Sequence, residues 1–245
     1  MMSWHEGILV GLDFETSGTD PETDRIVTAS VVYWQNGQTL DSRSWLSDAG
    51  GVEIPAGATA VHGISTRVAR SAGRPAAEVV AEVKIPLAEA VERGLPIVAM
   101  NASFDLTMLE AEAVRYGQRG LFSVSVPYVL DPRVLDKHTD PWRPGRRTLT
   151  DLCGHYRVPL LDAHSAHADA EAACAVVWEI AARHDWLTDL SLESLHEDQA
   201  RWAREQAVDL REYFARTPGR EHLAAGVRED WPIVPLWPVG LGERV

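Results

Sequence analysis

Two acidic side chains near the N-terminus of the chain are spaced for metal chemistry. Asp13 and Glu15 end an apolar run, residues 8–16, whose composition indicates a buried strand. Because side chains on a strand alternate between its two faces, both carboxylates point the same way, and they repel each other unless a cation lies between them. Carboxylate oxygens are the ligands that Mg²⁺ and Mn²⁺ prefer. The alternative interpretation is a solvated strand end.

Two segments far downstream carry the same kind of residue. A short apolar strand at 95–101 precedes a helix whose first turn contains Asp105, and a stretch from His164 to Asp169 leads into an alanine-rich helix. An Asp in a first helical turn also stabilises the helix N-terminus through the dipole and the free amides. For Asp105 and Asp169 that structural role is the alternative, and for His164 it is an exposed loop position.

Together these segments resemble the three motifs of the DEDDh family of 3′→5′ exonucleases. The motifs are Asp-x-Glu-Thr at 13–16, Asn-x-x-Phe-Asp at 101–105 and His-x-Ala-x-x-Asp at 164–169. A sister branch has Tyr four residues before the last acid, where this chain has Ser165, so the branch with His is the better match. Weaker similarity extends over roughly residues 6–185.

The resemblance implies a fold and an activity. The fold is α/β and ribonuclease-H-like, with a mixed five-stranded sheet, three antiparallel strands followed by two parallel ones, flanked by helices. The activity is hydrolysis of phosphodiester bonds at the 3′ ends of DNA or RNA, which releases nucleoside 5′-monophosphates. The implied cofactors are two divalent ions, Mg²⁺ or Mn²⁺, and the expected ligands are Asp13, Glu15, Asp105 and Asp169.

The two-metal mechanism also requires a proton acceptor. One ion lowers the pKa of a bound water and the other faces the leaving oxygen. A metal-bound carboxylate is a weak base, whereas an imidazole titrates near neutral pH, so we assign the general base to His164. The alternative base is His167, two residues before Asp169, which we expect to cap or pack against the helix.

The resemblance further implies a narrow pocket beside the first motif for the terminal nucleoside. Thr16 and Ser17 would line this pocket, and Asn101 of the second motif is a further substrate-binding candidate. Phe104 either wedges against the terminal bases or is an ordinary core aromatic. His62, within Val-His-Gly-Ile, either contacts the terminal nucleotide or is a turn histidine.

The charge of the chain limits its nucleic-acid partners. The 23 Lys and Arg against 36 Asp and Glu give a formal net charge of −13, which excludes general coating of polyanions. The segment 132–149 is locally basic and contains Trp142, so it could bind phosphates and stack a base, or be a plain solvated loop. This pattern favours short or single-stranded ends over long duplexes.

The cysteines and the N-terminus indicate a cytoplasmic protein. Cys153 and Cys174 both fall in predicted helices with apolar neighbours, and two buried thiols fit a reducing compartment. The N-terminus has neither the basic start nor the apolar centre of a signal peptide. The chain contains no apolar run long enough to span a membrane, so we expect no membrane contact.

The remaining elements follow from periodicity and turn residues. A hairpin is expected about Asn36-Gly37. A helix is expected over 76–93, and Pro86 should kink or divide it. The other expected elements are helices at 103–116 and 148–156, a long helix from 166, and a strand near 128–130.

The chain divides into an exonuclease domain, residues 1–188, and a C-terminal segment, residues 189–245. The segment contains an amphipathic helix, with apolar residues at helical spacing from Ala203 to Phe214, and a Pro/Trp-rich strap at 231–238. The strap could pack on its own domain, pair two copies as a homodimer, or recruit a DNA polymerase. The competing hypothesis for the whole chain is therefore a non-catalytic accessory or scaffold module that binds a polymerase through this segment.

Overall fold

The centre of the molecule is a mixed β-sheet. The computed structural model describes residues 3–123, 126–161 and 163–235. Within them the strand order is β3-β2-β1-β4-β5, with β1 antiparallel to β2 and parallel to β4. The strands are β1 (Leu9–Thr16), β2 (Ile26–Gln35), β3 (Gln38–Leu46), β4 (Ile97–Val98) and β5 (Val129–Leu130). The predicted sheet, three antiparallel strands followed by two parallel ones, is confirmed.

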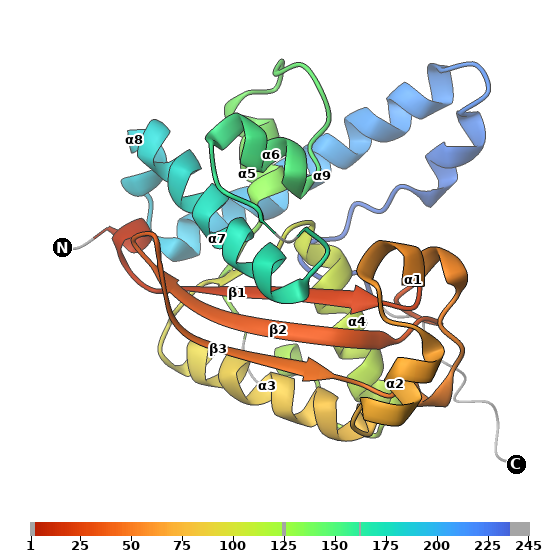
Figure 1. Cartoon of the computed structure of the whole chain (residues 1–245). Helices are drawn as coiled ribbons and strands as arrows, with labels where there is room; N and C mark the ends of the chain where they lie inside the picture. Colours follow the sequence, from red (N-terminus) through yellow and green to blue (C-terminus); the bar gives the residue numbers. More distant parts are fainter. Residues whose placement is uncertain (1–2, 124–125, 162, 236–245) are drawn as a thin grey trace, which may run out of the picture.

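Helices cover both faces of the sheet (Figure 1). They are α1 (Ala56–His62), α2 (Thr66–Ala72), α3 (Ala76–Glu92), α4 (Ala102–Arg115), α5 (Pro132–Thr139), α6 (Leu149–Tyr156), α7 (Ala166–Arg183), α8 (Asp185–Thr188) and α9 (Leu192–Arg216), with short 3₁₀ turns η1 (Trp4–Glu6), η2 (Ala49–Gly51), η3 (Leu121–Ser123) and η4 (Glu221–Gly226). None of these helices, within the residues described, has the length and apolar character needed to cross a bilayer.

Alternation along β1 divides the core into two layers. Val10, Leu12 and Phe14 pack with α3 and α4, whereas Leu9 packs with α7 on the opposite face. Asp13 and Glu15 have the same parity as Leu9, so strand geometry directs them toward α7. The apolar layers therefore decide which face of the sheet receives the carboxylates.

Gly11 allows α7 to lie directly on β1. A Cβ atom at this position would stand 2.5 Å from the carbonyl oxygen of Ala170 and 2.9 Å from Sγ of Cys174. Asp169 directly precedes Ala170 in the first turn of α7. The close approach at Gly11 thus brings this acid to the strand that carries Asp13.

The predictions for the Asn36-Gly37 hairpin and for the helix at Pro86 have different outcomes. The hairpin is confirmed, because Asn36 and Gly37 both have positive φ, 48° and 83°, as a type I′ turn requires. Of the two expected effects of Pro86, division of the helix is wrong, since α3 continues through it, and a kink stays a prediction. Pro86 is buried, and its carbonyl accepts a hydrogen bond from the Tyr33 hydroxyl at 2.7 Å. The proline therefore packs against β2 within one continuous helix.

The C-terminal segment packs on the same body. In α9 the buried side chains are Leu195, Gln199 and Trp202, and the ring of Trp202 stacks on His138 of α5 at 3.7 Å. In the strap, Trp231 packs against both core layers. Self-packing thus describes the strap through residue 235, while residues 236–238 lie outside the described part, and the division of the chain at residue 188 stays a prediction.

The contact at Gly11 can be tested by substitution. We expect Gly11→Ala to lower the free energy of unfolding by about 1–3 kcal/mol, because the added methyl group overlaps the backbone of α7. At Gly154, inside α6, a methyl group would meet no other atom within 4 Å, so Gly154→Ala should stabilise by about 0.5–1 kcal/mol. Urea denaturation measures both, and equal stability of the two variants would contradict the packing account.

Candidate active site

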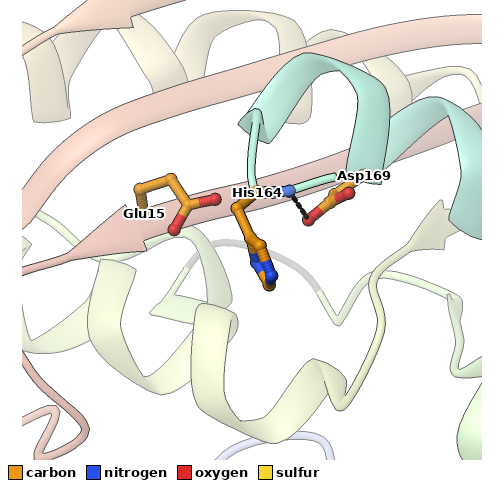
Figure 2. Close-up of side chains that lie close together, drawn as sticks. All are labelled: Glu15, His164 and Asp169. Atoms are coloured by element: carbon orange, nitrogen blue, oxygen red, sulfur yellow. Dashed lines mark hydrogen bonds between the residues drawn. The ribbon is translucent and has the colours of Figure 1, made fainter. Parts of the chain in front are cut away.

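Three side chains converge where β1 ends and α7 begins. Ligand atoms of Glu15, His164 and Asp169 all lie within 4.8 Å of one another, a spacing that could hold a metal ion. Figure 2 shows the Glu15 and Asp169 carboxylates on opposite sides of His164. The backbone N–H of His164 donates to Oδ2 of Asp169 at 3.3 Å, which ties the loop to the first turn of α7.

The other two predicted acids lie beside this group of three, but outside it. Asp105, only 3% exposed, accepts a hydrogen bond from the backbone N–H of Phe14 at 3.1 Å, so the start of α4 is joined to β1. The pKa of Asp13 lies well above its usual value, first because of burial and then because of the charges of Asp105, Asp169 and Glu15. The structure therefore brings all four predicted carboxylates into one neighbourhood, and places Glu15 and Asp169 within ligand distance of a shared ion.

Like charge and burial both disfavour ionisation in this cluster. Burial, followed by the charge of Asp169, raises the pKa of Glu15 to about 7. Burial also raises the pKa of Asp105, against the opposing effect of the hydrogen bond from Phe14. A nearby positive charge would stabilise the ionised form of these buried carboxylates. The donor set, carboxylate oxygens with one imidazole nearby, fits hard divalent cations such as Mg²⁺ or Mn²⁺.

The two candidate histidines differ in their surroundings. His164 is exposed on the loop before α7, and its φ of 68° lies in the left-handed region that non-glycine residues rarely adopt. His167 is partly buried in the first turn of α7. Among the described residues, it is not part of the group of Glu15, His164 and Asp169 that could hold a metal ion. The imidazole next to the acids is that of His164.

The predicted pocket residues lie beside the first motif. The hydroxyl of Thr16 donates to the carbonyl of Gly18 at 2.6 Å, and the buried Ser17 donates to Asp24 at 2.9 Å. Both hydroxyls therefore hold the turn that follows β1. Nδ1 of His62 accepts from the N–H of Ile64, and the Thr16 backbone is among the groups that act on the pKa of His62, which burial lowers. His62 thus lies close to this turn.

Asn101 and Phe104 line a groove of about 610 Å³ that continues along α9, past Leu210 and Phe214. Asn101 has a φ of 62°, and its side-chain oxygen accepts a hydrogen bond from Arg133 at 2.8 Å. Phe104 is half-buried and also packs against the core under α3 and α4. It therefore has a core contact together with an exposed edge in the groove.

The basic segment 132–149 departs from the predicted loop. Its first part is α5, and the fully buried Asp136 engages two of its arginines: Arg143 donates from Nη2 at 3.0 Å and Arg147 from Nε at 2.7 Å. The hydroxyl of Tyr156 completes the cluster at 2.9 Å. The hypothesis of phosphate binding is wrong for these two arginines, because a buried carboxylate already pairs with them. Trp142 is 91% exposed.

Sequence reasoning missed one buried acid near the site. Asp131, 2% exposed, accepts hydrogen bonds from the backbone N–H groups of Asn101, Ala102 and Arg133. The signal was present, since an Asp directly before Pro132 is the usual N-cap and first-turn pair of a helix. That pair also predicts α5, which the sequence analysis treated as a loop.

Comparison with protein families identifies the class to which the fold and site belong. The exonuclease (RNase T) family profile matches residues 10–177, more than half of the chain. The chain therefore belongs to this exonuclease family, whose members depend on divalent metals. No curated protein sequence gives a significant match.

Solved structures share the fold at low identity. Escherichia coli exonuclease I in complex with a dT13 oligonucleotide has a TM-score of 0.63 and 20% identity, over 75% of this chain and 43% of its own. Exonuclease I from Methylocaldum szegediense gives 0.60 and 18%, over 85% and 46%. Exonuclease X in complex with 5′ overhanging duplex DNA gives 0.54 and 20%, over 78% and 99%. The chain thus matches less than half the length of the two exonucleases I.

The repulsion within the cluster predicts a stability change. At about pH 8, above the pKa of Glu15 of about 7, Glu15→Gln should raise the melting temperature of the metal-free protein. Removing the cost of the buried charge and its repulsion by Asp169 should contribute about 1 kcal/mol after allowance for solvent screening, which corresponds to about 2–4 °C. Mn²⁺ should stabilise the wild type more than the variant. Differential scanning fluorimetry with and without EDTA measures both effects, and a melting temperature lower than that of wild type in EDTA would contradict the repulsion.

Proposed function

We propose that this protein is a metal-dependent exonuclease that removes nucleotides from single-stranded 3′ ends. The observation that carries the proposal is the convergence of Glu15, His164 and Asp169 within 4.8 Å, next to the buried acids Asp13 and Asp105. The family supplies the reaction class. The oligonucleotide bound to exonuclease I supports a single-stranded DNA substrate, and the net charge of −13 disfavours long duplexes.

We infer that two divalent ions, Mg²⁺ or Mn²⁺, bind to this cluster through Asp13, Glu15, Asp105 and Asp169. Four carboxylates offer enough negative charge and enough oxygen ligands for such a pair. When bound, the ions supply the positive charge that activates a water molecule and offsets the charge of the reacting phosphate.

His164 acts as the general base in this proposal. It takes a proton from the attacking water, whose oxygen forms a bond to phosphorus while the bond from phosphorus to the 3′ oxygen breaks. The products are a nucleoside 5′-monophosphate and a strand with a new 3′-hydroxyl, which takes up a proton from solvent. The exposed loop position of His164 leaves the ring accessible to the substrate.

The terminal nucleoside is proposed to bind beside the first motif. Thr16 and Ser17 shape this pocket through the turn that their hydroxyls hold, and His62 lies next to it. Asn101 and the exposed part of Phe104 would contact the terminal nucleotides from the start of α4. An aromatic ring at this position suits contact with bases without sequence preference.

The thiols bear on the cellular compartment, and the strap bears on the partners. Cys153 and Cys174 are buried and free, as predicted, which supports a reducing compartment such as the cytoplasm. The homodimer and the polymerase partner stay predictions. Trp231 and Ile233 pack against their own core, which favours self-packing of the strap.

The activity is tested with a 5′-labelled single strand in Mn²⁺. We expect a ladder of strands shortened from the 3′ end, abolished by EDTA and by Asp13→Asn. His164→Ala should lower turnover by about 10²–10⁴-fold, because a positioned base contributes that much. His167→Ala is the matched control on the same segment, and we expect it to retain activity close to that of wild type.

Two results would reject this assignment. Shortening that persists in Asp13→Asn would come from another protein or another site. An inactive wild type that still binds Mn²⁺ would favour the accessory-module hypothesis. Parallel assays on RNA and on dinucleotide ends with the same label would identify the preferred substrate, because discrimination by sugar depends on contacts to the 2′-hydroxyl.

A further inference from the structure

The C-terminal helix α9 makes buried hydrogen bonds to β5, the strand at one edge of the sheet. β5 is the last strand of the sheet order, so the outward backbone groups of Val129 lack a neighbouring strand. The side-chain amide of Gln199 donates to the Val129 carbonyl at 3.0 Å and accepts from the N–H of Asp131 at 2.9 Å. His196 accepts the Val129 N–H at 3.1 Å. Gln199 therefore replaces part of a missing strand with one side chain.

Asp131, whose N–H bonds to Gln199, in turn holds the start of α4 through its carboxylate. Its carboxylate accepts the N–H of Ala102 at 2.9 Å and that of Asn101 at 3.2 Å. The side chain of Asn101 makes no capping hydrogen bond to α4, so Asp131 supplies the cap from the neighbouring strand end. It also holds the positive-φ turn of Asn101, from which the helix departs.

The first turn of α4 carries Asp105. Asp105 in turn accepts the N–H of Phe14, directly between Asp13 and Glu15 on β1. A path of hydrogen bonds therefore runs from Gln199 through Asp131 and the start of α4 to Asp105. These three side chains are nearly inaccessible to solvent, with exposures of 0% for Gln199, 2% for Asp131 and 3% for Asp105. Buried hydrogen bonds of this kind cannot be exchanged for bonds to water, so each fixes the position of the next group.

We propose that Gln199 and Asp131 are positioning residues of the exonuclease site, and that α9 is a required part of it. Gln199 holds Asp131, and Asp131 holds the turn that places Asp105 against β1. The inference deepens the proposed function and rests on it. It assigns a role to α9, which begins at Leu192, beyond the family match that ends at residue 177.

The direct test is Gln199→Met in the full chain. Methionine keeps the length of the side chain and removes its hydrogen bonds, including the one to the Leu195 carbonyl within α9, and it leaves the Asp131 N–H and the Val129 carbonyl without their partner. Because small displacements of reacting groups cost up to about 100-fold in rate, we expect kcat to fall by about 10-fold or more. KM should change little, since Gln199 is fully buried and cannot touch the substrate.

The matched control lies two turns earlier, at the N-cap of the same helix. The Ser191 hydroxyl accepts a hydrogen bond from the backbone N–H of Ser194 at 3.0 Å, and Ser191 does not line the groove that contains Asn101 and Phe104. Ser191→Ala therefore weakens α9 without removing a hydrogen bond on the path to Asp105. We expect its kcat to stay within about 2-fold of wild type, as for mutations away from the reacting groups. Both variants are compared at a temperature where circular dichroism shows them folded.

A second measurement does not depend on turnover. The Mn²⁺ concentration that gives half of the maximal thermal stabilisation should rise about 10-fold in Gln199→Met, because groups that orient metal ligands affect affinity on that scale. It should stay unchanged in Ser191→Ala. Asp131→Asn, which replaces an acceptor by an amide, should show a larger rise than Gln199→Met.

The outcomes separate the inference from the proposed function. Gln199→Met with the kcat and the Mn²⁺ midpoint of wild type would overturn the positioning role, and so would an equal loss in Ser191→Ala. A wild type that binds Mn²⁺ but shortens no strand would instead overturn the exonuclease proposal. In that case the Mn²⁺ midpoints would still decide whether Gln199 positions the acidic cluster.

Discussion

The site is built around an electrostatic constraint: four carboxylates must be held together against their mutual repulsion. Burial raises the pKa of Asp13 and of Asp105, and the charges of Asp105, Asp169 and Glu15 raise the pKa of Asp13 further. Local structure alone would not keep such groups together. The apolar layers on both faces of the sheet provide the opposing free energy, because separating the acids would require α7 and α4 to leave β1.

Each acid is placed by a different element, and each element is fixed by a different contact. Alternation along β1 sets the direction of Asp13 and Glu15, and the close approach at Gly11 sets the position of α7. The hydrogen bond from Phe14 joins Asp105 to the same strand. Precision at the centre thus arises from backbone geometry, which is stiffer than the packing of long side chains.

Much of this arrangement could be predicted from the sequence. The period of two on β1 and the dipeptide Asn36-Gly37 report local geometry, and both agree with the structure. The convergence of Asp13 with Asp105 lies beyond local geometry, since 92 residues separate them (105 − 13). It was accessible only through the family resemblance, and the parallel pairing of β1 with β4 is what closes the gap.

Tertiary contacts explain what the sequence analysis missed. The charge of the segment 132–149 suggested phosphate binding, but Asp136 of the same segment is buried beneath its arginines, and burial cannot be read from a charge count. Pro86 lies within an unbroken helix because packing outweighs its local preference. The positioning role of Gln199 has no local signal, since the two groups that it holds at the sheet edge are 68 and 70 residues away.

The central claim is that these distant acids form one cation site, and its most direct test is a crystal structure of the protein soaked in Mn²⁺ with anomalous scattering data. The account predicts anomalous peaks between β1 and the starts of α4 and α7, within about 2.0–2.6 Å of oxygens from Asp13, Glu15, Asp105 or Asp169. Peaks elsewhere, with the four carboxylates ordered and free of metal, would contradict it.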